Sequence, residues 1–299
     1  MLYEFINIYE PSGIAQLSNG QIVIVEDDGM KPVSLLKFND TNPFEHLDKL
    51  NEFNFSPVEI NDLEALTIDQ YDHLYAITSH SLNRKGKLNS KRNRLIHFTI
   101  NDQRLDEVSL IENLREWIVA SYPELKKSTK IKNVQKNGGL NIEGLAYDKK
   151  KKQLLIALRS PLTKQDQAII IPITLTKQTF KNKLFNDKPL ELITLDLNGA
   201  GIRDFTYVPY LNAFIILSGT SSANKKSAKL WLWKRGKDAV RIKIKGAGKL
   251  GTAEGITPVK LLNKDAGIMI VIDDGEQESA QPGHYLFVSY DQLKFKYDI

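Results

Sequence analysis

The sequence contains no cysteine among its 299 residues. Disulfide bonds and thiolate metal sites are therefore excluded. No apolar run approaches the roughly 18 residues that a membrane-spanning helix needs, so we expect no membrane partner. The N-terminal segment MLYEFINIYEPSG also lacks the basic stretch and apolar core of a signal peptide. We therefore expect a cytoplasmic protein, with a secreted form whose signal has been removed as the alternative.

The sequence also lacks a strong excess of charge of either sign. It has 41 Lys and Arg against 36 Asp and Glu, a formal charge of +5 that is spread along the chain. Binding to duplex nucleic acid requires basic side chains concentrated on one face, so we expect no nucleic-acid partner. The mild positive charge is compatible with an anionic small-molecule partner. The length is enough for one large all-β domain or two ordinary domains.

Five stretches of the chain follow a common pattern. Each has a small or acidic residue, a short alternating run, a turn, and a second run rich in Ile, Leu and Val that ends in polar residues. The stretches begin at Pro11, Asp62, Asn141, Gly201 and Gly251. Their anchor residues are Ser12, Glu64, Glu143, Asp204 and Glu254, at spacings of 52, 79, 61 and 50 residues. Periods near 50 residues indicate repeat architectures such as four-stranded propeller blades.

The remainder of each period supplies further strands. QAIIIPITL and LELITLDL follow the third stretch, and AKLWLWKR and AVRIKIKG follow the fourth. Their alternation and β-branched residues are typical of strands. The sequence therefore predicts an all-β fold, a five-bladed propeller of four-stranded antiparallel blades formed by residues 1–299 as a single domain. The last unit lacks one strand, which either LYEFINIY near the N-terminus or LKFKYDI at the C-terminus could supply.

The longest spacing predicts a helical insertion at about residues 101–137, between blades 2 and 3. Leu110, Leu114, Trp117 and Ile118 have helical spacing, and Pro123 ends the pattern. This helix could pack on the outside of a blade or form a lid over the face that carries the anchors. The run of lysines at 149–152 predicts a solvated hairpin tip rather than a phosphate site.

The anchors should meet at the propeller axis, because the first strand of every blade lines it. Four carboxylates there would repel one another by several kcal/mol per pair. Shared protons, backbone N–H donors or a bound cation could relieve this repulsion. A hard divalent cation fits best, and we predict Ca²⁺ as the cofactor because it accepts irregular sets of oxygen ligands. Purely structural bonding of the carboxylates to the backbone is the alternative. Glycines follow three of the anchors and suit a crowded axis.

The polar ends of the second runs should surround this ring, because a hairpin places the end of its second strand beside the start of its first. Arginines there would bind phosphoryl oxygens, and a carboxylate or imidazole would activate water. The candidate substrate-binding residues are Arg84, Arg159 and Arg203, and the candidate catalytic residues are Asp28, His80, Asp273 and Asp274. The alternatives are structural ion pairs for two of the arginines, a rim position for the histidine, and a turn for the paired aspartates.

The five anchors resemble the calcium-activated nucleotidases (apyrases), which are five-bladed propellers with a central Ca²⁺. The resemblance implies that Ser12, Glu64, Glu143, Asp204 and Glu254 bind calcium, although Asp204 replaces a smaller polar residue of that family. NIEGLAYD, IALRSP and ITSHS look closer to uncharacterised bacterial propellers related to esterase-like phytases and lactonases. That second resemblance spans most of the chain and implies no particular reaction.

Three hypotheses of function follow. The first is a Ca²⁺-dependent hydrolase of a phosphorylated small molecule, either a phosphoester or a phosphoanhydride. The second is a non-catalytic ligand- or protein-binding propeller in which the cation only holds the blades together. The third is a lactonase or esterase in which the metal polarises a carbonyl.

Overall fold

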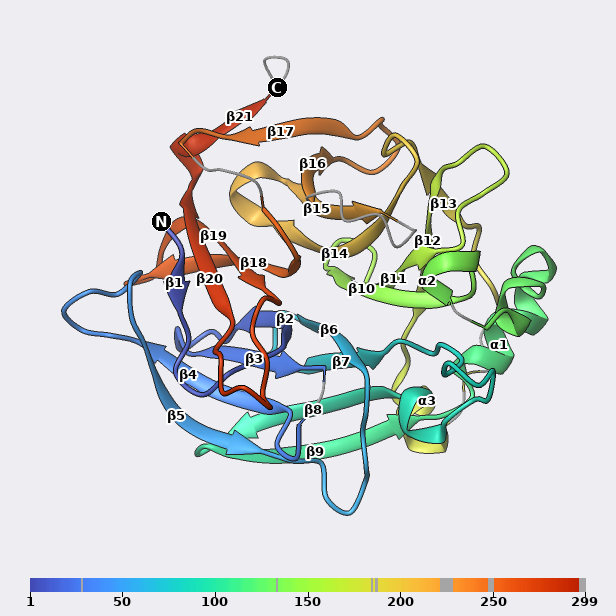
Figure 1. Cartoon of the computed structure of the whole chain (residues 1–299), viewed down its shortest axis with the longest axis horizontal. Helices are drawn as coiled ribbons and strands as arrows, with labels where there is room; N and C mark the ends of the chain where they lie inside the picture. The colour runs from blue at the N-terminus through green and yellow to red at the C-terminus, as the bar shows by residue number, and fades with distance from the viewer. Residues whose placement is uncertain are drawn as a thin grey trace.

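The structure is a computed structural model that describes residues 1–27, 29–132, 134–183, 185, 188–220, 228–246 and 250–295. These residues form five antiparallel sheets placed around a common axis (Figure 1). The predicted five-bladed propeller is therefore confirmed. None of the helices in these ranges is long and apolar enough to cross a membrane.

The first three blades each contain four strands that are consecutive in the chain and in the sheet. Blade 1 consists of β2 (Pro11–Gln16), β3 (Ile22–Glu26), β4 (Val33–Phe38) and β5 (Leu47–Phe53). Blade 2 consists of β6 (Leu63–Ile68), β7 (Leu74–Thr78), β8 (Leu95–Asn101) and β9 (Arg104–Ile111). Blade 3 consists of β10 (Asn141–Asp148), β11 (Gln153–Ser160), β12 (Ala168–Thr174) and β13 (Ile193–Leu195).

The last two blades use both ends of the described chain. Blade 4 consists of β14 (Ala200–Val208), β15 (Ala213–Thr220), β16 (Lys229–Trp233), β17 (Val240–Ile244) and β21 (Leu293–Phe295). Blade 5 consists of β18 (Ala253–Leu261), β19 (Lys264–Ile272), β20 (His284–Ser289) and β1 (Tyr3–Glu4). The N-terminal segment thus supplies the strand that the last unit lacks. The C-terminal segment instead adds a fifth strand to blade 4 by pairing with β17.

Helical segments lie in the connections between strands. Between β9 and β10 these are α1 (Leu114–Ser121), η2 (Pro123–Leu125), η3 (Ser128–Lys130) and α2 (Val134–Asn137). Elsewhere they are η1 (Ser90–Arg92), α3 (Lys177–Asn182), η4 (Pro209–Leu211) and η5 (Tyr290–Gln292). The insertion therefore starts after β9, and Leu110 belongs to that strand rather than to the helix. The short helix α3, between β12 and β13, was not anticipated from the sequence.

Helix α1 is a packed element and not a detached lid. Its side chains Leu114, Trp117 and Ile118 are buried in an apolar cluster that also contains residues of blades 2 and 3. Arg115 on the same helix is buried and donates hydrogen bonds to the backbone oxygens of His80 and Thr129. These contacts fix the helix against the blades, which agrees with the packed alternative of the sequence analysis.

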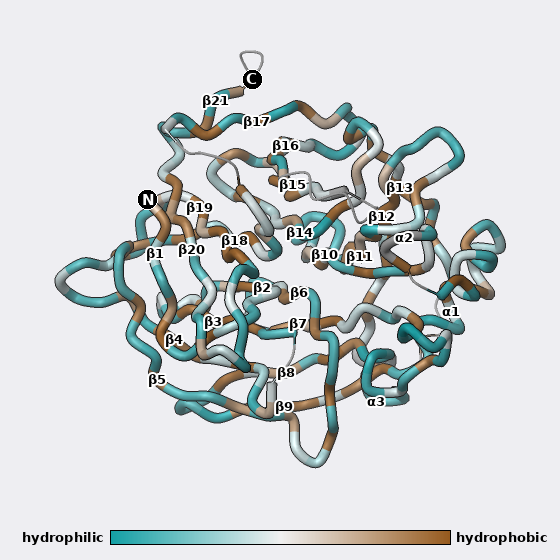
Figure 2. Tube along the Cα trace, in the orientation of Figure 1, coloured by the Kyte–Doolittle hydropathy of each residue, from teal (hydrophilic) through white to brown (hydrophobic). Residues whose placement is uncertain are grey.

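Apolar side chains fill the five boundaries between neighbouring blades. Each of the five apolar clusters draws on two adjacent blades, and in Figure 2 the brown hydrophobic segments follow the strands. Because both faces of a blade are covered, strands such as β3 are buried along their whole length. Glycines allow the inner strands of neighbouring blades to approach closely, since a Cβ atom at Gly13 would lie 2.6 Å from the backbone nitrogen of Leu66 and one at Gly255 would lie 3.1 Å from the Cα atom of Gly13.

Closure by β1 is testable with two adjacent residues. Phe5 is 2% exposed and its ring lies 4.7 Å from that of Tyr285, whereas Ile6 is 61% exposed. We expect Phe5→Ala to lower the free energy of unfolding by about 3 kcal/mol, because it leaves a cavity in the closing blade. Ile6→Ala should change it by less than about 0.5 kcal/mol. Urea denaturation measures both, and equal effects would contradict a stabilising role for the N-terminal closure.

Candidate functional site

A β-bulge occurs near the start of the inner strand of every blade. In blades 1, 2, 3 and 5 the residue that the bulge leaves unpaired is the predicted anchor: Ser12, Glu64, Glu143 and Glu254. In blade 4 the unpaired residue is Arg203, because Ile202 pairs with Ser218 and Asp204 already pairs with Leu217. The anchor assigned from sequence in blade 4 is therefore wrong by one residue. The equivalent ring contains three glutamates, one serine and one arginine.

Asp204 lies one residue further along, at the position of the glycines that follow the other anchors. It is buried, and its carboxylate accepts hydrogen bonds from the backbone N–H groups of Ile256, at 2.8 Å, and Leu145, at 3.5 Å. Burial raises the pKa of this carboxyl group well above its ordinary value. Asp204 therefore ties together the inner strands of blades 3, 4 and 5. Asp204 therefore fits the alternative that its carboxylate bonds to the backbone. These contacts do not support its predicted role as a metal ligand.

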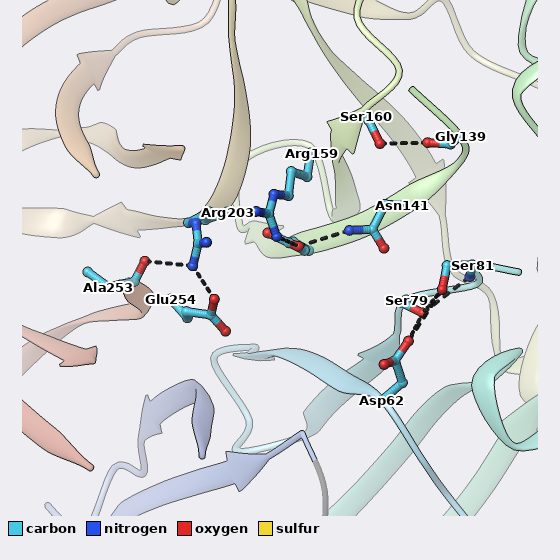
Figure 3. A network of polar contacts seen from close by, with 11 residues as sticks. Asp62, Ser79, Ser81, Gly139, Asn141, Arg159, Ser160, Arg203, Ala253 and Glu254 are labelled. Atoms are coloured by element: carbon cyan, nitrogen blue, oxygen red, sulfur yellow. Dashed lines mark hydrogen bonds and ion pairs between the residues drawn. The ribbon is translucent and has the colours of Figure 1, made fainter. Parts of the chain in front are cut away.

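Two of the three ring glutamates form ion pairs with arginines. Arg159 Nη1 lies 2.5 Å from Glu143 Oε1, which also accepts a hydrogen bond from Asn141 Nδ2 at 2.9 Å. Arg203 forms an ion pair with Glu254 (Figure 3). Arg159 and Arg203, two of the three predicted arginines, thus lie beside the anchors, where they form the structural ion pairs considered as an alternative.

Glu64 differs from the other ring glutamates. Among the residues that the structure describes, none forms a hydrogen bond or an ion pair with its carboxylate. Burial raises its pKa well above the ordinary value, and the negative charges of Glu143 and Asp62 raise it further. One carboxylate oxygen from each of Asp27, Asp62 and Glu64 lies within 4.8 Å of the others. An acidic cluster therefore forms where blades 1 and 2 meet.

The position of Asp62 within this cluster is fixed by its neighbours. Its carboxylate accepts a hydrogen bond from Ser79 Oγ and lies 3.1 Å from Arg92 Nη1. Figure 3 shows Asp62 with its serine partners across the site from Arg203 and Glu254. The sequence analysis did not single out Asp62 or Asn141. Each stands two residues before a bulged glutamate, and this shared offset is a signal that could have identified both.

Ser12, the remaining anchor, is completely buried. Its hydroxyl group donates to the backbone oxygen of Leu63 at 2.5 Å and so links the inner strands of blades 1 and 2. The hydroxyl proton is therefore directed at the backbone of the neighbouring blade. Ser12 and Glu64 are close in the fold, as predicted, but they have different surroundings.

His80, a predicted catalytic residue, does not occupy the rim position that was considered as its alternative role. It is completely buried, and its Nδ1 atom lies 2.7 Å from the backbone oxygen of Thr78. Burial lowers the pKa of the imidazole to about 4, so the ring is neutral at physiological pH. The left-handed backbone of His80, with φ of 55°, accompanies this inward position. A role in activating bulk water does not fit these surroundings.

The predicted catalytic aspartates have different environments. Asp28 lies outside the described residues. Asp274 is exposed and its Oδ1 atom lies 2.9 Å from His284 Nδ1. Asp273 is partly buried, and burial followed by the charge of Glu10 raises its pKa to about 6. The charges of Arg203 and Glu143 also affect the pKa of Asp273.

A pocket of about 840 Å³ opens beside Glu64. Its lining includes Asp62, Glu64, Ser81, Leu82, Asn83, Arg84, Lys85, Arg92, Val134 and Asn141. The predicted substrate residue Arg84 thus belongs to the same pocket as Glu64. Arg159 and Arg203 instead bind the carboxylates of the ring. The pocket combines two carboxylates of the acidic cluster with three basic side chains, an arrangement that suits a cation together with an anionic ligand.

The opposite face of the molecule carries the lysine run. Lys150 and Lys151 donate backbone hydrogen bonds to Asp148 Oδ1 in the turn between β10 and β11. Their exposure confirms the predicted hairpin tip.

The raised pKa values predict an unusual pH dependence of stability. A carboxyl group whose pKa is higher in the folded state stabilises the fold at low pH and loses this contribution as pH rises through the folded pKa. The pKa of Glu254 is raised to about 7 and that of Asp273 to about 6, and that of Glu64 is also raised. We expect the melting temperature, measured with a chelator present, to fall between about pH 5 and pH 8.

The variant Glu64→Gln should flatten this pH profile, because it removes one of the carboxyl groups whose ionisation destabilises the folded state. Glu278 is exposed, so Glu278→Gln serves as the matched control and should leave the profile unchanged. Thermal unfolding followed by circular dichroism provides the measurement. If Glu64→Gln and the wild type had parallel profiles, the electrostatic description of the ring would be incorrect.

Comparisons with known proteins place this chain within a family. The fold is similar to a GH43 β-1,3-galactosidase bound to galactodeoxynojirimycin, with a TM-score of 0.52, 9% identity and coverage of 100% of this chain and 97% of the other. A PQQ-bound aldose sugar dehydrogenase from Streptomyces coelicolor gives a TM-score of 0.45 and 10% identity, covering 98% of both chains.

A streptogramin B lyase gives a TM-score of 0.41 and 12% identity, covering 96% of this chain and 97% of the other. At these identities the similarity concerns the propeller fold, and it adds no support to the nucleotidase resemblance. No curated protein matches the sequence. The family model described as "Protein of unknown function (DUF3616)" matches residues 123–291, more than half of the chain, and the chain therefore belongs to that family.

Proposed function

We propose that the pocket beside Glu64 binds Ca²⁺ together with a phosphorylated small molecule and hydrolyses its phosphoester or phosphoanhydride bond. The observation that carries this proposal is the carboxylate of Glu64. It has no hydrogen-bond or ion-pair partner among the described residues, belongs to a cluster of three carboxylates, and lines a pocket with basic walls.

The acidic cluster supports a cation because its negative charge is only partly balanced. Asp27, Asp62 and Glu64 converge within 4.8 Å, Arg92 forms a salt bridge with Asp62, and the carboxylate of Glu64 has no hydrogen-bond or ion-pair partner among the described residues. Carboxylates at such distances repel one another by several kcal/mol at intermediate dielectric. Ca²⁺ suits this site because it prefers oxygen ligands and tolerates irregular geometry. The proposed ligand set therefore shifts from the five predicted anchors to Glu64 and its two neighbours.

The basic side chains of the pocket support an anionic substrate. Arg84 and Lys85 are exposed in the connection between β7 and β8, and Arg92 lies deeper, held by Asp62. Guanidinium groups bind phosphoryl oxygens in a bidentate manner. None of the described residues that line this pocket is aromatic, so a stacking platform for a neutral sugar is missing from this lining. A phosphorylated ligand therefore fits better than the sugar of a glycosidase.

A bound divalent cation would supply charge neutralisation at the phosphoryl group and would lower the pKa of a water molecule. The protein itself would orient the phosphate through Arg84 and Arg92. The predicted base Asp273 is not among the described residues that line this pocket, so the proposal assigns it no role in activating water.

The first test is the substitution Glu64→Gln. It removes one negative ligand while nearly preserving the shape of the side chain, so we expect Ca²⁺ affinity to fall by roughly tenfold or more and turnover to be lost. Calorimetry with Ca²⁺ and a panel of nucleotides, sugar phosphates and phosphodiesters provides the measurements. The control Glu278→Gln should match the wild type in both.

The panel also separates the three hypotheses. Calcium-dependent turnover of a phosphate ester or anhydride supports the proposal. Turnover of lactones alone would favour the esterase alternative, and Ca²⁺ binding without any turnover would favour a binding propeller. Absence of Ca²⁺ binding by the wild-type protein would overturn the proposed cation site.

A second test concerns the basic wall of the pocket. We expect Arg84→Gln to raise KM for the phosphorylated substrate several-fold with little change in kcat, because Arg84 is exposed at the pocket and contributes to binding. Lys87→Gln is the matched control, since Lys87 is exposed in the same connection but does not line the pocket. Steady-state kinetics would contradict the proposal if the two variants behaved alike.

A further inference from the structure

A second group of metal-ligating side chains lies on blade 2, away from the axis. His73 directly precedes β7, His97 belongs to β8 and Glu107 belongs to β9. One ligand atom from each lies within 4.8 Å of the other two. This group stands at the opposite end of β6 from Glu64 and contains two imidazoles, so its ligand chemistry differs from that of the carboxylate cluster.

The orientation of His73 is already fixed in the manner typical of a metal ligand. Its Nδ1 atom lies 3.0 Å from Asp69 Oδ2, while Asp69 Oδ1 accepts the backbone N–H groups of Tyr71 and His73. A carboxylate that holds one imidazole nitrogen sets the tautomer and leaves Nε2 available as a ligand. The His73 side chain is 37% exposed, so an ion from solvent can reach it.

The backbone of β9 is distorted at Glu107, the third candidate ligand. The pairing of His97 with Ser109 is followed by the pairing of Thr99 with Asp106, so a bulge contains Glu107. Glu107 has a left-handed φ of 51°, a conformation that costs energy for a residue with a side chain. Bulges of this kind re-aim side chains, and here the carboxylate comes within reach of both imidazoles.

The surroundings of His97 complete the arrangement. Its ring lies 5.3 Å from the ring of His73 and 5.0 Å from that of Phe180 on α3, and its Nδ1 atom lies 3.4 Å from Ser109 Oγ. An apolar neighbour limits the access of water to one side of a site, and a hydroxyl group can hold the ring orientation. Three protein ligands of the type His, His and Glu suit Zn²⁺, with a fourth position left for water.

We propose that His73, His97 and Glu107 form a site for a first-row divalent cation, of which Zn²⁺ is the best match. This site is independent of the proposed Ca²⁺-dependent function. In a tetrahedral site the ligand atoms would be about 3.4 Å apart, so binding requires only small rotations of side chains such as the exposed Glu107. The ion would connect the turn before β7 to β8 and β9 and would thereby brace the outer part of blade 2.

The test is calorimetric titration of the chelator-treated full-length protein with Zn²⁺, together with its melting temperature. We expect one site that is retained in Glu64→Gln and a rise in melting temperature on binding. His73→Gln and Glu107→Gln alter exposed side chains and should each weaken binding by roughly tenfold or more. His46→Asn replaces another exposed histidine and should have no effect.

Long-range ¹H–¹⁵N spectra of the imidazoles supply a second readout. Zn²⁺ should shift the ring nitrogens of His73 and His97 while those of His46 stay unchanged. No Zn²⁺ binding by the wild-type protein, or an affinity unaltered in both His73→Gln and Glu107→Gln, would overturn the proposal. Loss of Zn²⁺ binding in Glu64→Gln alone would assign the ion to the carboxylate cluster instead and would equally overturn it.

Discussion

The structure around the axis depends on a backbone feature that is repeated five times, the bulge near the start of each inner strand. A bulge takes one residue out of the regular pairing, and in a propeller five such residues come together at one end of the axis. Because three of them are glutamates, the fold brings like charges together in a partly buried place. The arginines, the buried aspartate and the pocket can all be understood as consequences of that convergence.

The ring is electrostatically asymmetric although the blades are similar. Arg159 and Arg203 form ion pairs with the glutamates of blades 3 and 5, and Asp204 accepts hydrogen bonds from backbone N–H groups. On the side of blades 1 and 2 three carboxylates converge, the carboxylate of Glu64 has no hydrogen-bond or ion-pair partner among the described residues, and the pocket opens on that side. The blades therefore share one architecture but differ in charge at this end of the axis, because the residues at equivalent positions differ from blade to blade.

Irregular backbone also accounts for the second group of ligands. Glu107 lies near the two histidines because of a bulge in an outer strand, just as Glu64 owes its position to a bulge in an inner strand. In both cases the regular strands supply a rigid frame, and one local departure from strand pairing aims a carboxylate. The two sites differ in chemistry because oxygen ligands alone favour a hard cation, whereas imidazole ligands favour a transition metal.

The sequence by itself determined the propeller, its five blades and the identity of four ring residues, because strand-forming apolar runs that recur at intervals near 50 residues are typical of four-stranded propeller blades. The tertiary structure decided the rest. The ring position of blade 4 belongs to Arg203 and not to the predicted Asp204. The repeat alignment missed this because it does not show where a one-residue bulge falls. His80 is completely buried and has a left-handed backbone conformation, neither of which was predicted from the sequence. The cluster of Asp27, Asp62 and Glu64 depends on contacts between two blades, and these exist only once the chain has folded.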